Sequence, residues 1–261
     1  MATYLDRILA AHRSDAAADR RNHDVLLDEA KNQPPTRGFA AALRDAVALA
    51  VIAEIKRRSP SKGDLNVDLE PDTLAMSYAS GGATCLSVLT DREFFGGSPY
   101  DLQVARAATT VPVLRKDFTV AATDVFDARL MGADAVLLIV AALDDAELRD
   151  FHGLGQEVGL DVLVEVHDEA ELERALAIGA ELIGVNQRDL VSFEVDRARA
   201  VRVAAAMPPS VTRVAESGID GPDDARALAE AGFDAVLVGE SLVTAEDPVA
   251  AVRALGQADP T

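Results

Sequence analysis

The chain has 261 residues and 49% of them are hydrophobic, which is enough for one sizeable core. Its net charge of −19 argues against nucleic acid or an anionic membrane as a partner, and no run approaches the ~20 apolar residues of a membrane span. The single cysteine, Cys85, excludes an internal disulfide, and the N-terminus lacks an apolar signal segment, so we expect a cytoplasmic protein.

The N-terminal segment, residues 1–47, is predicted to be helical. Leu5, Ile8 and Leu9 recur at helical spacing, and a second apolar group surrounds Leu26. The helical pattern breaks at residues 32–35, where two prolines follow an asparagine and a glutamine, and it resumes from Phe39 to Leu49. We therefore expect a helical extension in front of the main fold.

Eight short apolar segments follow, and each is predicted to be a strand. They cover residues 51–55, 84–89, 111–114, 135–140, 162–166, 182–185, 211–215 and 235–238. Amphipathic segments such as 169–178 and 223–231 lie between them. Four of the strands follow a glycine that suits the left-handed end of a helix, namely Gly82, Gly132, Gly179 and Gly232.

Near-continuous apolar strands that alternate with helices are typical of a parallel sheet covered by helices. Eight such units in about 210 residues predict an α/β fold, a (β/α)8 TIM barrel that forms a single domain over residues 1–261. A doubly wound open sheet is the alternative. That fold would place a glycine-rich dinucleotide turn after the first strand, and this chain has KRRSPSKG there instead.

Polar residues gather at the predicted carboxyl ends of the strands, where such barrels carry their chemistry. Glu54 and Lys56 are two residues apart and should point to the same side of the first strand. Lys116 ends the third strand and Glu165 the fifth. A single charge there could be an ordinary loop residue. Lysines and glutamates that converge on one pocket would supply a general acid and a general base with shifted pKa values.

Two glycine turns indicate a phosphate site. Ser217-Gly218 follows the seventh strand and Gly239-Glu240 follows the eighth, where this fold often holds phosphate. Ser59 could add a hydroxyl from across the mouth. Ordinary turn chemistry is the alternative. Phe95 and Phe118, with Phe94, could clamp an aromatic substrate or could pack in the core.

The four histidines do not predict a zinc site. His12 and His23 belong to the N-terminal helices and are expected to be exposed. His152 lies in a helix–loop region, and His167 ends a strand without a second histidine at metal-ligand spacing. No metal ligands are therefore assigned.

Seven motifs, which occur in order at seven of the eight strand ends, together resemble the indole-3-glycerol phosphate synthase family. They are AEIKRRSPSKG (53–63), VLTDREFFGGS (88–98), PVLRKDF (112–118), LVEVHDE (163–169), GVNQRDL (184–190), AESGI (215–219) and VGESL (238–242). The resemblance covers nearly the whole chain, including the helical N-terminal extension, and is specific because the motifs occur in order.

The resemblance implies an enzyme of tryptophan biosynthesis without cofactor or metal. Its substrate would be an anionic phosphosugar, 1-(2-carboxyphenylamino)-1-deoxyribulose 5-phosphate, which becomes indole-3-glycerol phosphate with loss of CO2 and water. By motif position, Lys116 resembles the general acid, Glu165 the general base, and Lys56 the residue that binds the substrate carboxylate or acts as a second acid. The oligomeric state is left open, with a monomer as the default.

The resemblance also implies three sets of supporting residues. Glu54, Asn186 and Ser217 would orient the catalytic groups and the substrate hydroxyls. The phosphate would be held by Ser59, Gly218, Gly239 and the Glu240 backbone. The anthranilate side would be lined by Pro60, Phe95, Phe118, Arg188 and Leu190, and Glu216 is counted with the substrate-binding residues.

The chain also departs from the family pattern. Residues 119–124 read TVAATD where many members carry a tyrosine–glutamine pair, Gln187 stands where asparagine or serine is common, and Glu240 stands where some members have serine. Three other interpretations stay open. One is another phosphosugar barrel, such as a phosphoribosylanthranilate isomerase. The second is a non-catalytic phosphate-binding barrel. The third is a Schiff-base role for Lys56 or Lys116.

Overall fold

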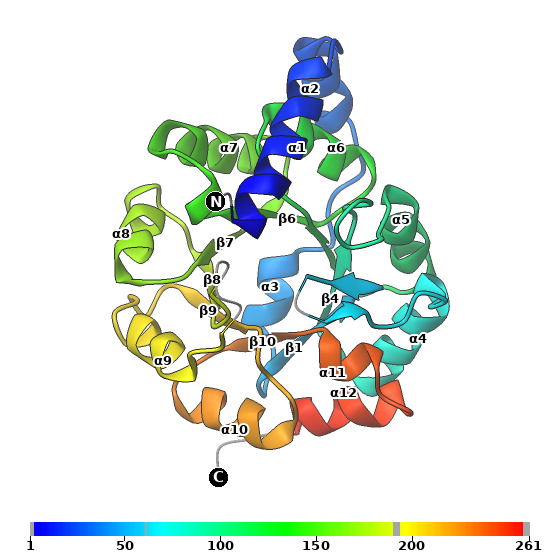
Figure 1. Cartoon of the computed structure of the whole chain (residues 1–261), viewed down its shortest axis with the longest axis vertical. Helices are drawn as coiled ribbons and strands as arrows, with labels where there is room; N and C mark the ends of the chain where they lie inside the picture. Colours follow the sequence, from blue (N-terminus) through cyan, green and yellow to red (C-terminus); the bar gives the residue numbers. More distant parts are fainter. Residues whose placement is uncertain (1–2, 61, 190–193, 258–261) are drawn as a thin grey trace.

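The computed structural model describes residues 3–60, 62–189 and 194–257, and its centre is a closed barrel of eight parallel strands (Figure 1). The strands are β1 (Ala50–Ile55), β4 (Cys85–Leu89), β5 (Val113–Lys116), β6 (Ala135–Ile139), β7 (Asp161–Val166), β8 (Leu182–Asn186), β9 (Thr212–Glu216) and β10 (Ala235–Val238). Strand β1 pairs with β4 on one side and β10 on the other, which closes the barrel. The expected (β/α)8 fold is confirmed, and the open sheet is excluded.

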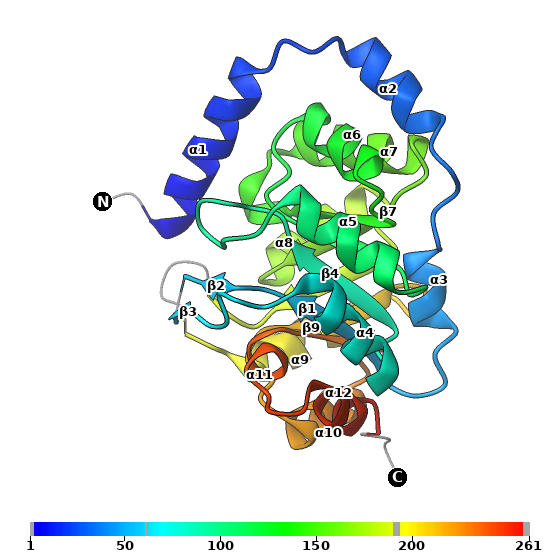
Figure 2. The same ribbon diagram turned by 90° about the vertical axis from the view of Figure 1, so that its right-hand side faces the viewer.

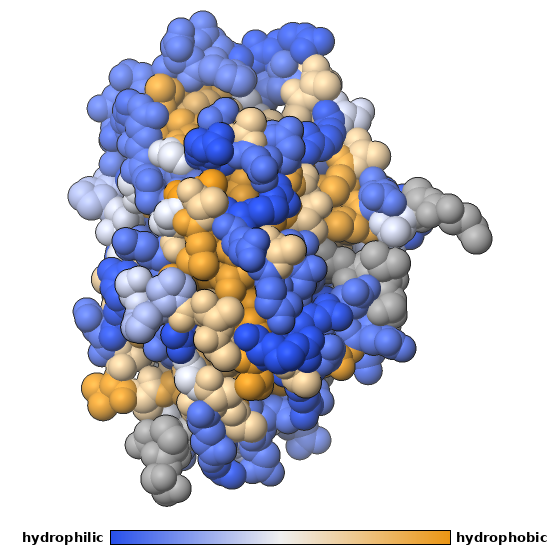
Figure 3. Space-filling model, turned by 90° about the vertical axis from the view of Figure 1, so that its left-hand side faces the viewer, coloured by the Kyte–Doolittle hydropathy of each residue, from blue (hydrophilic) through white to orange (hydrophobic). Residues whose placement is uncertain are grey.

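Helices surround the barrel on its outside (Figure 1). They are α4 (Pro71–Gly81), α5 (Pro99–Ala108), α6 (Ala122–Leu130), α7 (Asp145–Glu157), α8 (Glu169–Ala177), α9 (Arg197–Ala205), α10 (Pro222–Glu230), the short α11 (Glu240–Val243) and α12 (Pro248–Gly256), with a 3-10 turn η1 (Val140–Ala142). The barrel strands are buried because helices cover one face and side chains fill the interior. Hydrophilic residues cover most of the outer face seen in Figure 3.

The four expected glycine caps are present. Gly82, Gly132, Gly179 and Gly232 follow α4, α6, α8 and α10, with φ of 96°, 94°, 79° and 88°. A residue with a Cβ rarely adopts this left-handed conformation, so glycine lets the chain leave each helix and enter the next strand directly.

The N-terminal extension forms an arch from one end of the barrel to the other (Figure 2). Helix α1 (Tyr4–Ala18) lies near the carboxyl ends of the strands, α2 (His23–Lys31) packs against α6, and α3 (Phe39–Arg44) lies at the opposite end. Phe39 is fully buried there and Leu43 nearly so. The helix expected to reach Leu49 ends at Arg44, because the chain must turn to enter β1.

Several strands extend further than their apolar runs. Strand β5 reaches Lys116, which stands opposite Leu89 of β4, and β8 and β9 reach Asn186 and Glu216, which stand opposite each other. A two-strand hairpin of β2 (Arg58–Ser59) and β3 (Gly63–Asp64), absent from the sequence expectations, follows β1. Among the helices that the structure describes, none combines the length and apolar character needed to cross a bilayer.

Candidate active site

A cavity opens at the carboxyl ends of the barrel strands. It brings together all but one of the sequence-predicted site residues: Glu54, Lys56, Ser59, Pro60, Phe95, Lys116, Phe118, Glu165, Asn186, Arg188, Glu216, Ser217, Gly218, Gly239 and Glu240. The remaining one, Leu190, lies outside the described residues. Parallel strands that end at the same rim direct their last side chains inward, so residues up to 186 positions apart in the sequence share one pocket.

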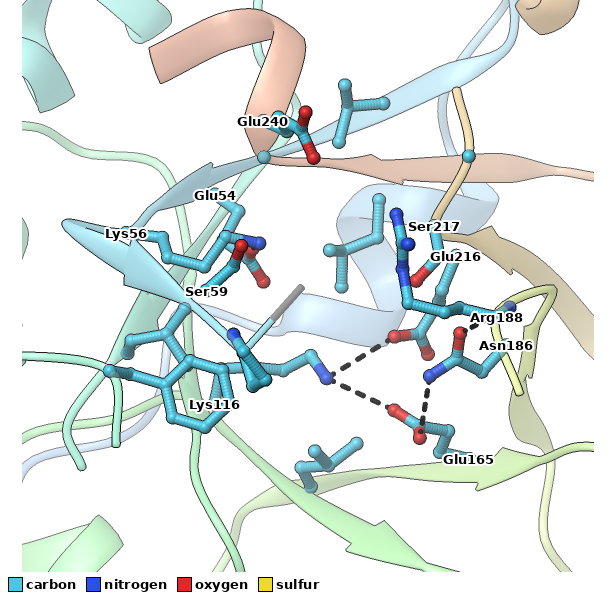
Figure 4. Close-up of a pocket in the computed structure, with 18 of the residues that line it drawn as sticks. Glu54, Lys56, Ser59, Lys116, Glu165, Asn186, Arg188, Glu216, Ser217 and Glu240 are labelled. Atoms are coloured by element: carbon cyan, nitrogen blue, oxygen red, sulfur yellow. Dashed lines mark hydrogen bonds and ion pairs between the residues drawn. The ribbon is translucent and has the colours of Figure 1, made fainter. Parts of the chain in front are cut away.

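Lys116 spans the cavity from β5 toward two glutamates on the far wall (Figure 4). Its Nζ lies 3.1 Å from Oε2 of Glu165 on β7 and 3.5 Å from Oε2 of Glu216 on β9. Burial opposes the positive charge of Lys116, but the Glu165 carboxylate, aided by Glu54 and by Glu216 where it is ionised, outweighs burial and raises the pKa of the amine. Lys116 is therefore protonated at neutral pH.

The two glutamates that face Lys116 have opposite protonation preferences. Burial raises the pKa of Glu165, but Lys116, His167 and a hydrogen bond from Asn186 outweigh burial and leave that pKa below its usual value. Glu216 is equally buried. Burial and the neighbouring charges of Glu165 and Glu54 exceed the effect of Lys116 and raise its pKa to about 8. At neutral pH one carboxyl group is thus ionised while its neighbour retains a proton.

Asn186 fixes the orientation of Glu165. Its Nδ2 donates to Oε1 of Glu165 at 3.0 Å, and its Oδ1 accepts from the backbone N–H of Arg188 at 3.0 Å. Because both ends of the amide are engaged, Asn186 cannot flip without losing a hydrogen bond. Glu165 therefore presents its other oxygen, Oε2, to Lys116.

Glu54 and Lys56 form a second pair, as the two-residue spacing predicts. Nζ of Lys56 donates to Oε1 of Glu54 at 2.5 Å, and both side chains point into the cavity (Figure 4). Gly239 makes room for this pair: a Cβ at that position would lie 2.3 Å from Oε1 of Glu54 and 3.0 Å from Nζ of Lys56. Lys116, at the end of β5, and Lys56, directly after β1, thus enter the cavity from different places, each with its own carboxylate.

The expected phosphate end carries unusual backbone geometry. Among the described residues, Ser217 is the one non-glycine with positive φ, at 67°, and Gly218 follows with φ 65°. Gln187 supports this turn by donating from Nε2 to the Ser217 carbonyl at 2.8 Å. Helix α11 begins directly after Gly239, and Gly239 and Glu240 line the cavity. Such strained turns cluster at functional sites.

The aromatic residues at the rim separate into two roles. Phe95 and Phe118 line the cavity and face each other, with ring centroids 6.1 Å apart. Phe94 instead packs its ring edge-on against Tyr4 of α1, at 5.8 Å. Phe95, Phe118 and Pro60 therefore give the cavity an apolar part of its wall.

The sequence matches the family model described as indole-3-glycerol phosphate synthase over residues 5–255. It is 47% identical over 260 residues to the indole-3-glycerol phosphate synthase of Polaromonas sp. strain JS666, with 98% of each chain covered. It is 50% identical over 257 residues to that of a Nocardioides strain, with 95% of this chain and 96% of the relative covered.

The chain belongs to the indole-3-glycerol phosphate synthase family. It is accordingly a carboxy-lyase of tryptophan biosynthesis. Two solved structures share the fold at low identity. A thiamine phosphate pyrophosphorylase from Pyrococcus furiosus has a TM-score of 0.61 at 19% identity, with 83% of this chain and 96% of that chain covered. An N-acetylmannosamine-6-phosphate 2-epimerase from Clostridium perfringens has a TM-score of 0.60 at 12% identity, with 76% and 89% covered.

Gly184 in β8 is a residue of the site that was not predicted from the sequence. It stands opposite Glu165 of β7, and a Cβ there would lie 2.0 Å from Oε1 of Glu216. Gly184 therefore leaves the space in which the Glu216 carboxyl lies. The signal was the glycine inside an apolar strand, which often marks a close approach.

The expectation that His12 is exposed is wrong. Its side chain is 18% exposed, and its Nε2 lies 2.9 Å from Oδ2 of Asp91 and 3.8 Å from Oδ1 of Asp117. These three residues are grouped closely enough to hold a cation. However, Asp117 already accepts from Arg115 at 3.0 Å. We therefore assign the group to an ion-pair network that holds α1 at the rim.

The arginines near the mouth are largely committed to other carboxylates. Arg57 pairs with Asp101, Arg58 with Asp64 at 2.9 Å, and Arg115 with Asp117. Paired in this way, these three arginines add little net positive charge at the mouth of the cavity. Among the described residues that line the cavity, the cations are Lys56, Lys116 and Arg188. Lys56 and Lys116 are themselves paired, with Glu54 at 2.5 Å and with Glu165 at 3.1 Å, but unlike the three arginines above they line the cavity.

Proposed function

We propose that the chain converts 1-(2-carboxyphenylamino)-1-deoxyribulose 5-phosphate to indole-3-glycerol phosphate, with loss of CO2 and water. The observation that carries this proposal is that Nζ of Lys116 lies 3.1 Å from Oε2 of Glu165, in a cavity that is lined both by apolar and aromatic residues and by glycine turns. This arrangement suits a substrate with an aromatic ring at one end and a phosphate at the other.

Lys116 is the proposed general acid and Glu165 the proposed general base. In ring closure the aromatic carbon that bears the carboxylate attacks the sugar carbonyl, whose oxygen gains negative charge and takes a proton from Nζ of Lys116. The bond to the carboxylate then breaks, CO2 leaves, and the bonding electron pair restores the aromatic ring. In the dehydration that follows, Glu165 accepts a proton from the ring-closed intermediate. The pKa directions support these roles, because the acid holds its proton at neutral pH and the base is ionised.

Lys56 is proposed to bind the substrate carboxylate and to act as a second acid when the hydroxyl group leaves. Glu54 holds its ammonium group, Asn186 orients Glu165, and Ser217 contacts the substrate hydroxyls. The phosphate is assigned to Ser59, Gly218, Gly239 and the Glu240 backbone. The anthranilate ring is assigned to Pro60, Phe95, Phe118, Arg188 and Leu190, and Glu216 supports Lys116.

The thiol that an isomerase mechanism would need is poorly placed. Cys85 is fully buried, and its Sγ lies 3.8 Å from the Phe39 carbonyl of α3, the helix at the opposite end of the barrel. Burial also raises the pKa of this thiol. A buried, protonated thiol does not favour a cysteine base. It is also consistent with our proposal of a cytoplasmic enzyme.

The direct test follows indole formation. The chain contains no tryptophan, so indole emission has almost no protein background. The purified protein is mixed with the proposed substrate, and indole fluorescence is recorded together with CO2 release. A rise in indole fluorescence that runs parallel to CO2 release supports the proposal. Isomerisation of phosphoribosylanthranilate instead, or binding of the substrate without turnover, would contradict it. If borohydride traps a substrate adduct on Lys56 or Lys116, that lysine forms a Schiff base with the substrate, which would contradict its role as a general acid.

A further inference from the structure

His167 lies next to the proposed base but takes no part in the mechanism above. It follows Glu165 by two residues at the end of β7, and its Nε2 lies 3.6 Å from Oε1 of Glu165. That nitrogen is buried and has no hydrogen-bond partner among the described residues. His167 does not line the cavity, so it can reach a substrate only through Glu165.

The other ring nitrogen is held from outside by Glu171. Oε2 of Glu171 on α8 lies 3.0 Å from Nδ1 of His167, and the same oxygen accepts from the backbone N–H of His167 at 2.7 Å. A carboxylate at Nδ1 requires that nitrogen to carry a proton. The ring is thus fixed in one orientation, with Nε2 aimed at Glu165.

The charges around the ring favour an imidazolium. Glu165 lies at Nε2 and Glu171 at Nδ1, and Glu216 of β9 adds to them only where the pH is high enough for it to ionise. Burial disfavours the charged ring, but the carboxylates outweigh it and the pKa of His167 is raised. On the far side of Glu165 the nearest cation is Lys116, at 3.1 Å from the other carboxylate oxygen.

Glu165 therefore lies between two cationic groups, one at each oxygen. In the proposed reaction Lys116 gives its proton to the substrate before Glu165 acts as a base. A carboxylate that is 1% exposed would then lose its main charge partner while still buried. His167 is the cation that remains in place at this stage, because Glu171 holds it and the substrate does not touch it.

We propose that His167 is a positioning residue for Glu165: clamped by Glu171, its ring keeps the carboxylate ionised and aimed at the cavity after Lys116 has given up its proton. This inference rests on the proposed function, since it gives Glu165 the role of base. It adds a residue pair, His167 and Glu171, to the groups that control the dehydration half of the reaction.

The test compares pH profiles of turnover for wild type, His167→Gln and Glu171→Gln. Glutamine keeps the size of the side chain but cannot become a cation. In His167→Gln the acidic limb of kcat, which reports the enzyme–substrate complex, should move up by at least one pH unit. The plateau of kcat at high pH should stay within about threefold of the wild-type value, and so should KM. Glu171→Gln should move the limb in the same direction by less.

The control is His152→Gln, which changes another buried histidine, located on α7 away from the cavity. Its acidic limb should coincide with that of wild type. A His167→Gln profile that coincides with wild type would overturn the proposal. An equal loss of kcat at every pH would also overturn it, since that pattern indicates a structural role.

An NMR titration keeps this inference separate from the proposed function. The imidazole resonances of His167 are followed in wild type and in Glu165→Gln, without substrate. The proposal expects the pKa of His167 to fall by at least one unit when the carboxylate is removed, and an unchanged pKa would overturn it. If wild type makes no indole, the proposed function fails, while this titration still decides whether the two residues are coupled.

Discussion

Two glycines make room for the carboxyl groups of the cavity. Gly239 leaves space for the Glu54–Lys56 pair, and Gly184 leaves space for Glu216 between β8 and β9. In both places an added methyl group would lie far inside van der Waals distance of a carboxylate oxygen. Polar residues at strand ends are visible in a sequence. The space around them depends on the register between strands, which a single sequence does not supply.

Replacing Gly184 by alanine should therefore damage both activity and stability. The new Cβ would displace the Glu216 carboxyl and weaken its contact with Lys116. We expect a loss of about 1–3 kcal/mol in the free energy of unfolding, the usual cost of overpacking, and about a tenfold lower kcat. Urea unfolding and the indole assay measure the two effects.

Gly153→Ala is the matched control for this substitution. Gly153 lies on the exposed face of α7, where an added Cβ meets nothing within 4 Å. Alanine should stabilise that helix by about 0.5–1 kcal/mol. A Gly184→Ala protein with the stability and turnover of wild type would contradict the prediction, since Glu216 could then move without a loss of free energy.

Among the secondary-structure elements, the barrel strands were the easiest to predict and α1 the hardest to place. Each strand has an apolar run that is buried on both faces, so its centre is evident from composition. The apolar runs stop short of the strand ends because polar residues such as Lys116 and Glu216 interrupt the pattern, although Lys116 was expected at the end of its strand. Helix α1 docks through His12 and Asp91, which are 79 residues apart, and no local pattern encodes such a contact.

The docking of α1 should depend on His12. Its ring lies 5.5 Å from that of Phe118, which lines the cavity, so the same contact joins the helix to the apolar wall. In His12→Ala we expect residues 4–18 to be cleaved several-fold faster by a protease, and KM for the substrate to rise by a similar factor. His23→Ala, an exposed histidine on α2, serves as control. Equal cleavage of both variants and wild type would refute this role.

Contacts of His12 also give α1 a pH dependence. Burial lowers the pKa of His12, but Asp91 and Asp117 outweigh it and raise the pKa above 6.5. A raised histidine pKa stabilises the folded state at acidic pH, and this contribution is lost as the pH rises through the folded pKa. Cleavage of α1 in wild type should therefore become faster above neutral pH.

For the whole molecule, buried charge links stability to pH. The pKa of Glu216 is raised to about 8 from an ordinary value of 4.5, so the folded state binds that proton more tightly than the unfolded chain does. Wild-type stability should therefore fall as the pH rises between these two values. Glutamine at this position cannot ionise and removes the effect.

We predict that the free energy of unfolding of Glu216→Gln, measured relative to that of wild type, increases from pH 5 to pH 9. The gain should be at least about 1 kcal/mol, which corresponds to roughly one unit of pKa shift. Urea unfolding at the two pH values measures it, and titrating groups remote from the cavity cancel in the difference. A difference between the proteins that does not change with pH would contradict the raised pKa.

The central claim is that Lys116 donates the proton that drives ring closure, and one measurement tests it most directly. Turnover of wild type, Lys116→Ala and the surface control Lys31→Ala is compared by indole emission. The loss of a general acid should lower kcat by at least ~10²-fold in Lys116→Ala, while Lys31→Ala keeps wild-type turnover. A folded Lys116→Ala protein with near-normal turnover would contradict the account and move the acid role to Lys56.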